Sequence, residues 1–140
     1  LELFAVRRIL EPEASARAAS RSTPELISAL TVHIDSVDGT TSVEGLVDHD
    51  LEFHRTIADA AGNRYLASLI DSLSSSTVRA RIWRGLTQDN AVERTLSEHR
   101  GIVAALESGD VELARALTLV HVSGVEAWLR EWTAAASRTD

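Results

Sequence analysis

Asp50-Leu51-Glu52-Phe53-His54 places a carboxylate and an imidazole four residues apart, inside the segment 46–66 with the sequence LVDHDLEFHRTIADAAGNRYL. Residues at positions i and i+4 lie on one face of an α-helix. Apolar residues recur at the same spacing, so we expect Asp50 and His54 beside the buried stripe of a helix. These apolar residues are Leu46, Val47, Phe53, Ile57 and Ala61. A polar pair in that position indicates either a hydrogen bond within the helix or part of a metal site.

The rest of the chain also has a helical pattern. Ala, Leu, Glu and Arg dominate, Gly and Pro are sparse, and no segment alternates with a period of two for long. The sequence therefore predicts an all-α fold. Capping signals predict six helices, at about 1–20, 24–38, 43–61, 64–84, 91–107 and 111–136. The signals are Thr23-Pro24, Ser42, Gly62-Asn63 and Ser108-Gly109-Asp110.

Two further expectations concern these helices. Pro12 should kink or divide the first one, because proline removes a backbone donor. The apolar spacing also predicts which residues face inward. They include Leu3 and Leu10 in the first helix, Leu69 and Ile70 in the fourth, and Leu113, Val120 and Val125 in the last.

Composition limits the class of protein. With 140 residues, 44% of them hydrophobic, the chain fits one globular domain, residues 1–140. No apolar run approaches the roughly 20 residues of a membrane span, and the amino terminus does not resemble a signal peptide. We therefore expect a soluble, cytoplasmic domain with no membrane partner. The net charge of −7 argues against nucleic-acid binding by these residues, because phosphate contacts need a basic patch.

Two more histidines are expected at matching heights on neighbouring helices. His99 lies ten residues before Gly109, and His121 lies twelve residues after it. At about 1.5 Å per residue, antiparallel helices would bring both imidazoles level with each other. Because the chain has no cysteine, a metal ion would need His, Asp or Glu ligands. Asp50 and His54 would complete such a set, whereas the simpler alternative gives each histidine one structural hydrogen bond.

Three other polar residues are expected to take no part in this set. His49 points off the face that carries Asp50, and His33 has no partner that sequence spacing can supply. Glu98 directly precedes His99 and should face elsewhere.

Arg7 and Arg81 are expected on the inward faces of the first and fourth helices, with Arg81 one turn after Thr77. Buried cations need anions. One interpretation is a structural salt bridge, and the other is that these arginines grip the carboxylate of a ligand. We take Arg7, Arg81 and Thr77 as candidate ligand-binding residues.

The order and spacing of several short motifs resemble a known family over nearly the whole chain. The motifs are Phe4-x-x-Arg7-x-x-Leu10-Glu11, Asp50-x-x-Phe53-His54, Ala61-Gly62-Asn63-x-x-Leu66, Glu98-His99-x-x-Ile102, Gly109-Asp110 and His121. They resemble the C-terminal effector-binding domain of FadR-type GntR-family transcription regulators, the FCD domain. The resemblance implies an antiparallel bundle of six to seven helices enclosing a ligand and metal pocket. It also implies a homodimer that binds DNA only through an N-terminal winged helix-turn-helix domain, which is missing from this chain.

In metal-containing members of that family, one Asp and three His hold a divalent ion. The matching residues here are Asp50, His54, His99 and His121. The resemblance implies zinc first, with nickel or manganese as alternatives, and a small organic acid as effector. Arg7 matches the arginine of the family's first helix.

The resemblance therefore implies a ligand sensor rather than an enzyme. The main alternative is a metal-dependent enzyme acting on a small carboxylate, because an ion with open positions can be a Lewis acid. No further Glu or His is positioned as a general base on the same faces, which disfavours this alternative. A structural interaction module with an incidental ion is the third interpretation.

Overall fold

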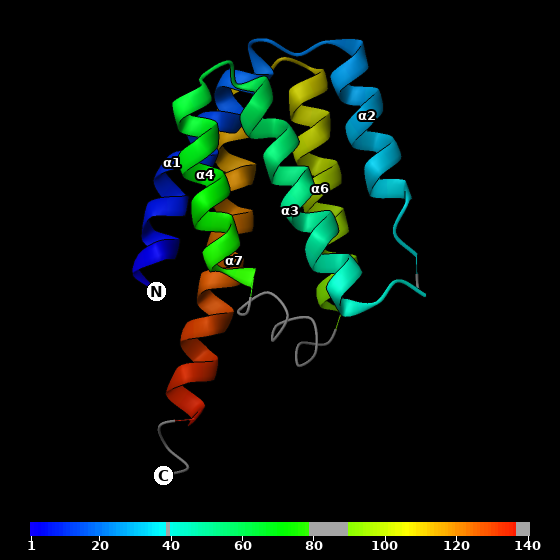
Figure 1. The fold of residues 1–140 in the computed structure, drawn as a ribbon. Helices are drawn as coiled ribbons and strands as arrows, with labels where there is room; N and C mark the ends of the chain where they lie inside the picture. The colour runs from blue at the N-terminus through cyan, green and yellow to red at the C-terminus, as the bar shows by residue number, and fades with distance from the viewer. Residues whose placement is uncertain (39, 79–89, 137–140) are drawn as a thin grey trace.

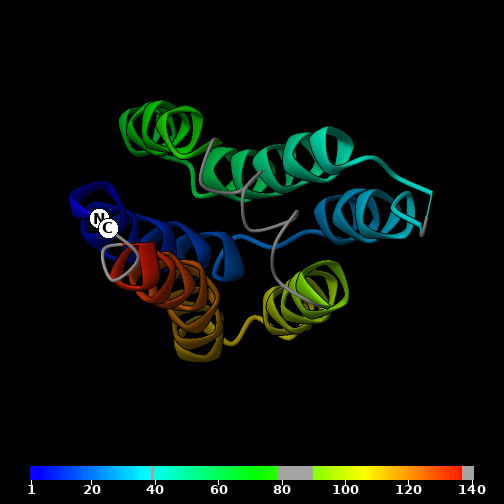
Figure 2. The same cartoon turned by 90° about the horizontal axis from the view of Figure 1, so that it is seen from below.

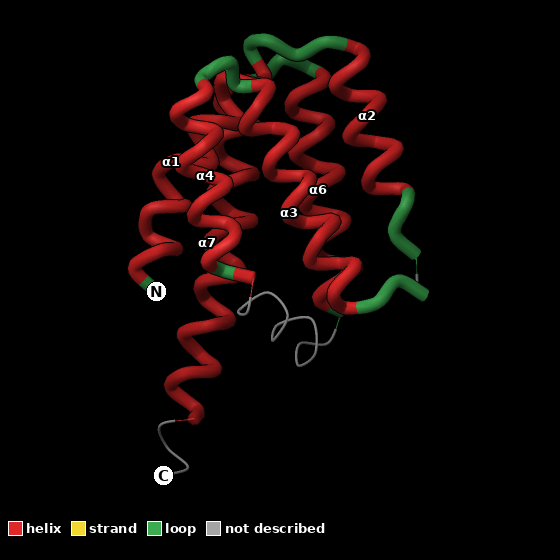
Figure 3. Tube along the Cα trace, in the orientation of Figure 1, coloured by secondary structure: helices red, strands yellow, loops and turns green. Residues whose placement is uncertain are grey.

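The computed structural model describes residues 1–38, 40–78 and 90–136 (Figure 1). The described residues form six α-helices and no strand, as Figure 3 shows, so the all-α prediction is confirmed. The helices are α1 (Glu2–Ala19), α2 (Pro24–Asp35), α3 (Val43–Ala60), α4 (Arg64–Ser76), α6 (Ala91–Glu107) and α7 (Val111–Ala136). None of the described helices is both long and apolar enough to cross a membrane.

Successive helices run up and down the bundle (Figure 1). Seen along the helices, α4 lies beside α3 and α7 beside α6, and α1 and α2 form the layer between these two pairs (Figure 2). α1 packs most extensively on α7 and also contacts α3, α4 and α6. α1 is therefore the helix that joins the two sides of the bundle.

Side-chain caps begin four of the helices where the sequence predicts them. Thr23, Ser42, Asn63 and Asp110 each accept a hydrogen bond from a backbone N–H in the following turn. These bonds satisfy N–H groups that the helix itself cannot pair. The short turns between helices are therefore fixed by local chemistry.

Two glycines end helices as predicted. Gly62, after α3, has a φ of +70°, and Gly109, after α6, has a φ of +68°. This left-handed conformation favours glycine because it has no Cβ.

Some helix boundaries differ from the prediction. Pro12 lies buried inside α1, which continues through it to Ala19. α2 ends at Asp35 rather than near Asp38, and α4 ends at Ser76. The predicted end of the fourth helix falls within 79–89, outside the described residues, as does Arg81.

Four apolar residues expected to face inward are exposed. Leu3, Leu69, Leu113 and Val120 are 40%, 55%, 44% and 59% exposed, whereas their neighbours Phe4, Ile70 and Ala114 are buried. In α1 and α7 the inward positions include Arg7, Thr118 and His121. A pattern built only on apolar residues therefore rotates the inward face of these two helices.

Buried polar side chains separate the apolar core clusters along α1 and α7. Ala14 belongs to a cluster with residues of α3 and α4, and Phe4 belongs to another with Val122 and Val125 of α7. Between these positions, α1 carries the buried Arg7 and Glu11. A layer of buried polar side chains therefore lies between these apolar clusters.

Candidate metal centre

Three helices bring four side chains together in the middle of the bundle. Their ligand atoms all lie within 4.8 Å of one another. α3 contributes two of them on successive turns, and α6 and α7 contribute one each. These residues, named here the Asp/His cluster, are Asp50, His54, His99 and His121. The three histidines are buried, and Asp50 is 15% exposed.

The nitrogen atoms that converge are all Nε2. Asp50 Oδ1 lies 3.2 Å from Nε2 of His99, and 3.5 Å and 3.8 Å from Nε2 of His54 and His121. Nε2 of His54 and Nε2 of His121 are 3.1 Å apart. Ligand atoms around a tetrahedral zinc ion, with bonds near 2.0–2.1 Å, are about 3.3 Å apart. The spacing of the Asp/His cluster therefore fits a small divalent ion.

Two carboxylates outside the Asp/His cluster hold the opposite edges of two imidazoles. Glu11 Oε2 lies 3.1 Å from Nδ1 of His54, and Glu98 Oε2 lies 2.8 Å from Nδ1 of His121. A carboxylate that accepts from Nδ1–H leaves the Nε2 lone pair free to bind a metal. Both imidazoles are therefore oriented as metal-binding histidines usually are.

The prediction that Glu98 faces elsewhere is wrong. Its side chain is 18% exposed and reaches across to His121 of α7. Arg94 Nε donates to its other oxygen, Oε1, at 2.9 Å. Side-chain spacing along one helix does not reveal such a contact, because the partner His121 belongs to another helix.

The short distance between two Nε2 atoms has an electrostatic consequence. With Nδ1–H of both His54 and His121 turned to carboxylates, their Nε2 lone pairs face each other and repel unless a proton or a cation lies between them. Burial opposes a charge on His54, but Glu11 and Asp50 outweigh it and raise its pKa above the ordinary value. Burial lowers the pKa of His121 despite Glu98. Of these two imidazoles, His54 therefore keeps its second proton to the higher pH.

His99 is the neutral imidazole of the Asp/His cluster. Burial lowers its pKa to about 3, although Asp50 acts in the opposite direction. Its ring stacks on Phe53, with centroids 3.8 Å apart. Among the described residues, no hydrogen-bond partner orients its Nδ1, so packing on Phe53 fixes this imidazole.

Arg7 is buried and paired with Glu11. Its Nε and Nη2 donate to the two carboxylate oxygens of Glu11, with 3.1 Å between Nη2 and Oε2. Burial alone would raise the pKa of Glu11, but His54 and Arg7 hold it far below its usual range. Arg7 therefore has the structural salt bridge that was one of the two expectations. Its Nη1 is buried without a partner among the described residues, which leaves one donor for a ligand.

Thr77 is buried at the end of α4, and its Oγ1 donates to the carbonyl oxygen of Ser74 at 3.0 Å. His33 and His49 lie outside the Asp/His cluster, as predicted. His33 nevertheless has a partner on α3, because its Nε2 lies 2.9 Å from the carbonyl oxygen of His49 and their rings stack. Spacing within α2 could not reveal this contact between two helices.

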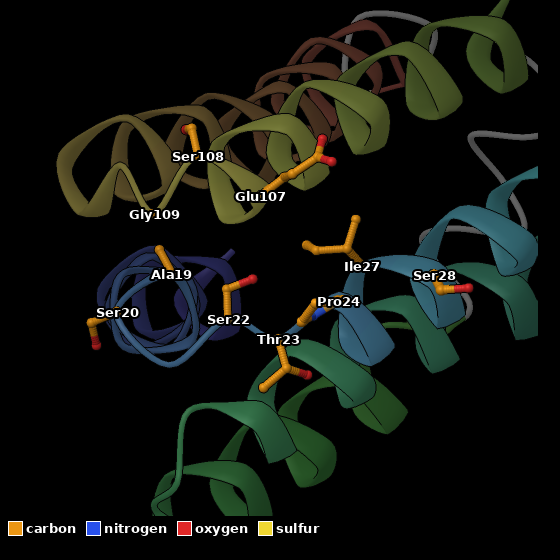
Figure 4. Close-up of a pocket in the computed structure, with 10 residues that line it drawn as sticks. All are labelled: Ala19, Ser20, Ser22, Thr23, Pro24, Ile27, Ser28, Glu107, Ser108 and Gly109. Carbon is orange, nitrogen blue, oxygen red and sulfur yellow. The ribbon is translucent and has the colours of Figure 1, made fainter.

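A surface groove lies elsewhere, at the turns that end α1 and α6 (Figure 4). Its lining includes Ser22, Thr23 and Ile27 on one side and Glu107 and Ser108 on the other. Glu107 is eight residues beyond His99, about 12 Å along α6. This groove is therefore separate from the Asp/His cluster.

Residues 2–124 match the family model of the FCD domain. The HTH-type transcriptional regulator LutR of Bacillus subtilis (strain 168) is 29% identical over 132 aligned residues, and the match covers 89% of this chain and 59% of LutR. Among solved structures, E. coli McbR/YncC has a TM-score of 0.83 at 18% identity, over 94% of this chain and 67% of that one. Streptococcus agalactiae GntR has a TM-score of 0.75 at 25% identity, over 89% and 56%. The chain thus spans less than two thirds of LutR.

Proposed function

The chain belongs to the FCD domain family, the effector-binding domains of GntR-family regulators, and we therefore propose that it senses a small organic acid at a divalent metal ion. The family consists of regulator domains and not of enzymes. In this proposal the Asp/His cluster holds the ion, and the acid occupies an open coordination position. Acid binding then alters how an N-terminal domain of the full-length protein binds DNA.

The observation that carries the proposal is the convergence of three Nε2 atoms and one carboxylate oxygen in the bundle core. Three nitrogens and one oxygen at this spacing suit zinc, which accepts His and Asp ligands and can add a further ligand. We propose zinc, with nickel or manganese as alternatives that bind similar ligands. When bound, the ion would supply an electrophilic position for an effector carboxylate.

The charge of the effector follows from the donors around the Asp/His cluster. Arg7 Nη1 is a buried cationic N–H group without a partner among the described residues, so it favours an anionic oxygen. We propose that Arg7, Thr77 and Arg81 contact the acid. Thr77 is a buried residue directly after the last residue of α4. Arg81 is included from the sequence pattern alone.

Regulation requires that the acid favour one arrangement of the protein over another. An acid that contacts the ion and Arg7 joins α1 to α3, α6 and α7. We propose that acid binding shifts α1 and that α1 passes this shift to a winged helix-turn-helix domain preceding residue 1, in keeping with the helix-turn-helix name of LutR. We further propose that the full-length protein is a cytoplasmic homodimer.

The test is a thermal-shift screen of organic acids on zinc-loaded and metal-stripped protein. The proposal predicts that some acids raise the melting temperature of the zinc-loaded protein and leave the stripped protein unchanged. Chromatography of the same mixtures should recover each acid intact, whereas a product would support the alternative of a metal-dependent enzyme. Equal stabilisation of both forms would contradict an ion-dependent effector site.

A further inference from the structure

Ser74 is a buried serine in α4 whose hydroxyl is left without a partner. The next two serines, Ser75 and Ser76, each donate to the backbone carbonyl one turn earlier at 3.0 Å, as helical serines commonly do. Ser74 is only 4% exposed, yet its Oγ has no hydrogen-bond partner among the described residues. Buried polar groups are nearly always paired, so this hydroxyl is an exception that calls for an explanation.

Arg7 carries the second buried donor without a partner, and packing places it level with Ser74. Leu10 and Ala14 of α1 pack in one cluster with Ile70 of α4. The two helices run in opposite directions (Figure 1). One turn from this cluster toward the same end of the bundle therefore leads to Arg7 on α1 and to Ser74 on α4.

The candidate metal centre lies at the same level on α3. Ala58 belongs to the same apolar cluster, and His54 precedes it by one turn toward that end of the bundle. Glu11 links Arg7 to the candidate metal centre, because its Oε2 lies 3.1 Å both from Nη2 of Arg7 and from Nδ1 of His54. A small molecule bound to an ion at this centre would therefore lie at the same level of the bundle as the two unpaired donors, Ser74 Oγ and Arg7 Nη1.

We propose that Ser74 Oγ and Arg7 Nη1 form a second binding point for the effector, which selects acids that carry another oxygen function besides the carboxylate on the ion. That function is a hydroxyl or a second carboxylate, which accepts hydrogen bonds from both donors. The inference rests on the proposed function. A site with buried donors discriminates strongly against ligands that leave those donors unpaired, so Ser74 is a specificity-determining residue.

The experiment measures acid affinities of the zinc-loaded protein by calorimetry. Acetate serves as the acid with one function, and glycolate, malonate, malate and succinate serve as acids with two. The parent should bind at least one of the second group more tightly than acetate. Ser74→Ala should lower the ratio of these two affinities about fivefold to tenfold, the value of one neutral hydrogen bond. Ser72→Ala, on the exposed face of α4, should leave the ratio unchanged.

Two controls separate selectivity from damage. Ser74→Ala removes a buried unpaired hydroxyl, so the metal-stripped variant should melt no lower than the parent. An unchanged affinity ratio in Ser74→Ala would overturn the inference and leave the proposed function standing. If the zinc-loaded parent bound none of the acids, the proposed function would fail and this inference with it.

Discussion

Glu98 accepts a 2.8 Å hydrogen bond from Nδ1 of His121, and the bond joins α6 to α7 beside the candidate metal centre. It turns Nε2 of His121 toward Asp50 and His54. The carboxylate therefore positions a proposed metal ligand without itself belonging to the Asp/His cluster.

Glu98→Ala should weaken zinc binding about tenfold to a hundredfold, because such outer carboxylates orient the ligand and raise its basicity. Competition with a chromophoric zinc chelator measures the affinity. Glu93→Ala changes an exposed carboxylate on the same helix and should have no effect. Equal affinities for the parent and Glu98→Ala would show that the bond to His121 does not support a metal ligand.

Glu11→Ala should destabilise the fold by about 3–5 kcal/mol, because it leaves the buried guanidinium of Arg7 without its anion. Urea unfolding of the metal-stripped protein measures the loss. The double variant Arg7→Met/Glu11→Leu should recover much of it, since it removes both charges together. A double variant as unstable as Glu11→Ala would mean that packing, rather than the unpaired charge, determines the cost.

The stability of the metal-stripped protein should also depend on pH through His49. Burial lowers the pKa of this imidazole to about 4, against 6.5 in its ordinary state. In the unfolded chain, His49 therefore binds a proton below about pH 6.5, whereas in the folded chain it binds one only below about pH 4. The contribution of His49 to stability is complete above pH 6.5 and is lost as the pH falls from 6.5 to 4.

Thermal unfolding of parent and His49→Gln between pH 7.5 and 4 checks this dependence. Glutamine keeps a polar side chain but does not titrate, so the melting temperature of the variant should fall less over the acid range. Parallel curves would show that His49 does not contribute to the loss of stability in acid.

Much of the fold follows from local signals in the sequence. Thr23, Ser42, Asn63 and Asp110 begin helices because their side-chain oxygens accept hydrogen bonds from free backbone N–H groups. Gly109 ends a helix because, without a Cβ, it adopts a left-handed backbone conformation at little cost. These interactions lie within a few residues of each other. The sequence pattern could therefore place most helix ends to within a few residues.

The inward faces of α1 and α7 were less predictable, because polar residues occupy part of the buried surface. Leu3 and Val120 are exposed, while Arg7 and His121 are buried beside them. Hydrophobicity alone favours the opposite assignment, although the position of Arg7 between Leu3 and Leu10 correctly predicted that it faces inward. Only the partners on other helices explain why these polar side chains are inside.

The four members of the Asp/His cluster could be chosen from spacing and turn positions, and the structure brings them together. The outer carboxylates could not be chosen in this way. Glu11 contacts His54 of α3, and Glu98 contacts His121 of α7, so each pair depends on how two helices pack. The same holds for the unpaired hydroxyl of Ser74, which only the side-chain contacts reveal.

The most direct test of the metal-dependent sensor is elemental analysis of protein purified without a histidine tag or chelator, beside His99→Ala/His121→Ala. A control variant, His33→Ala, changes a histidine outside the Asp/His cluster. We expect about one divalent ion, zinc, per chain in the parent and in His33→Ala, and its loss from the double variant. A parent that retains no metal after incubation with zinc, nickel or manganese and removal of the excess would contradict it.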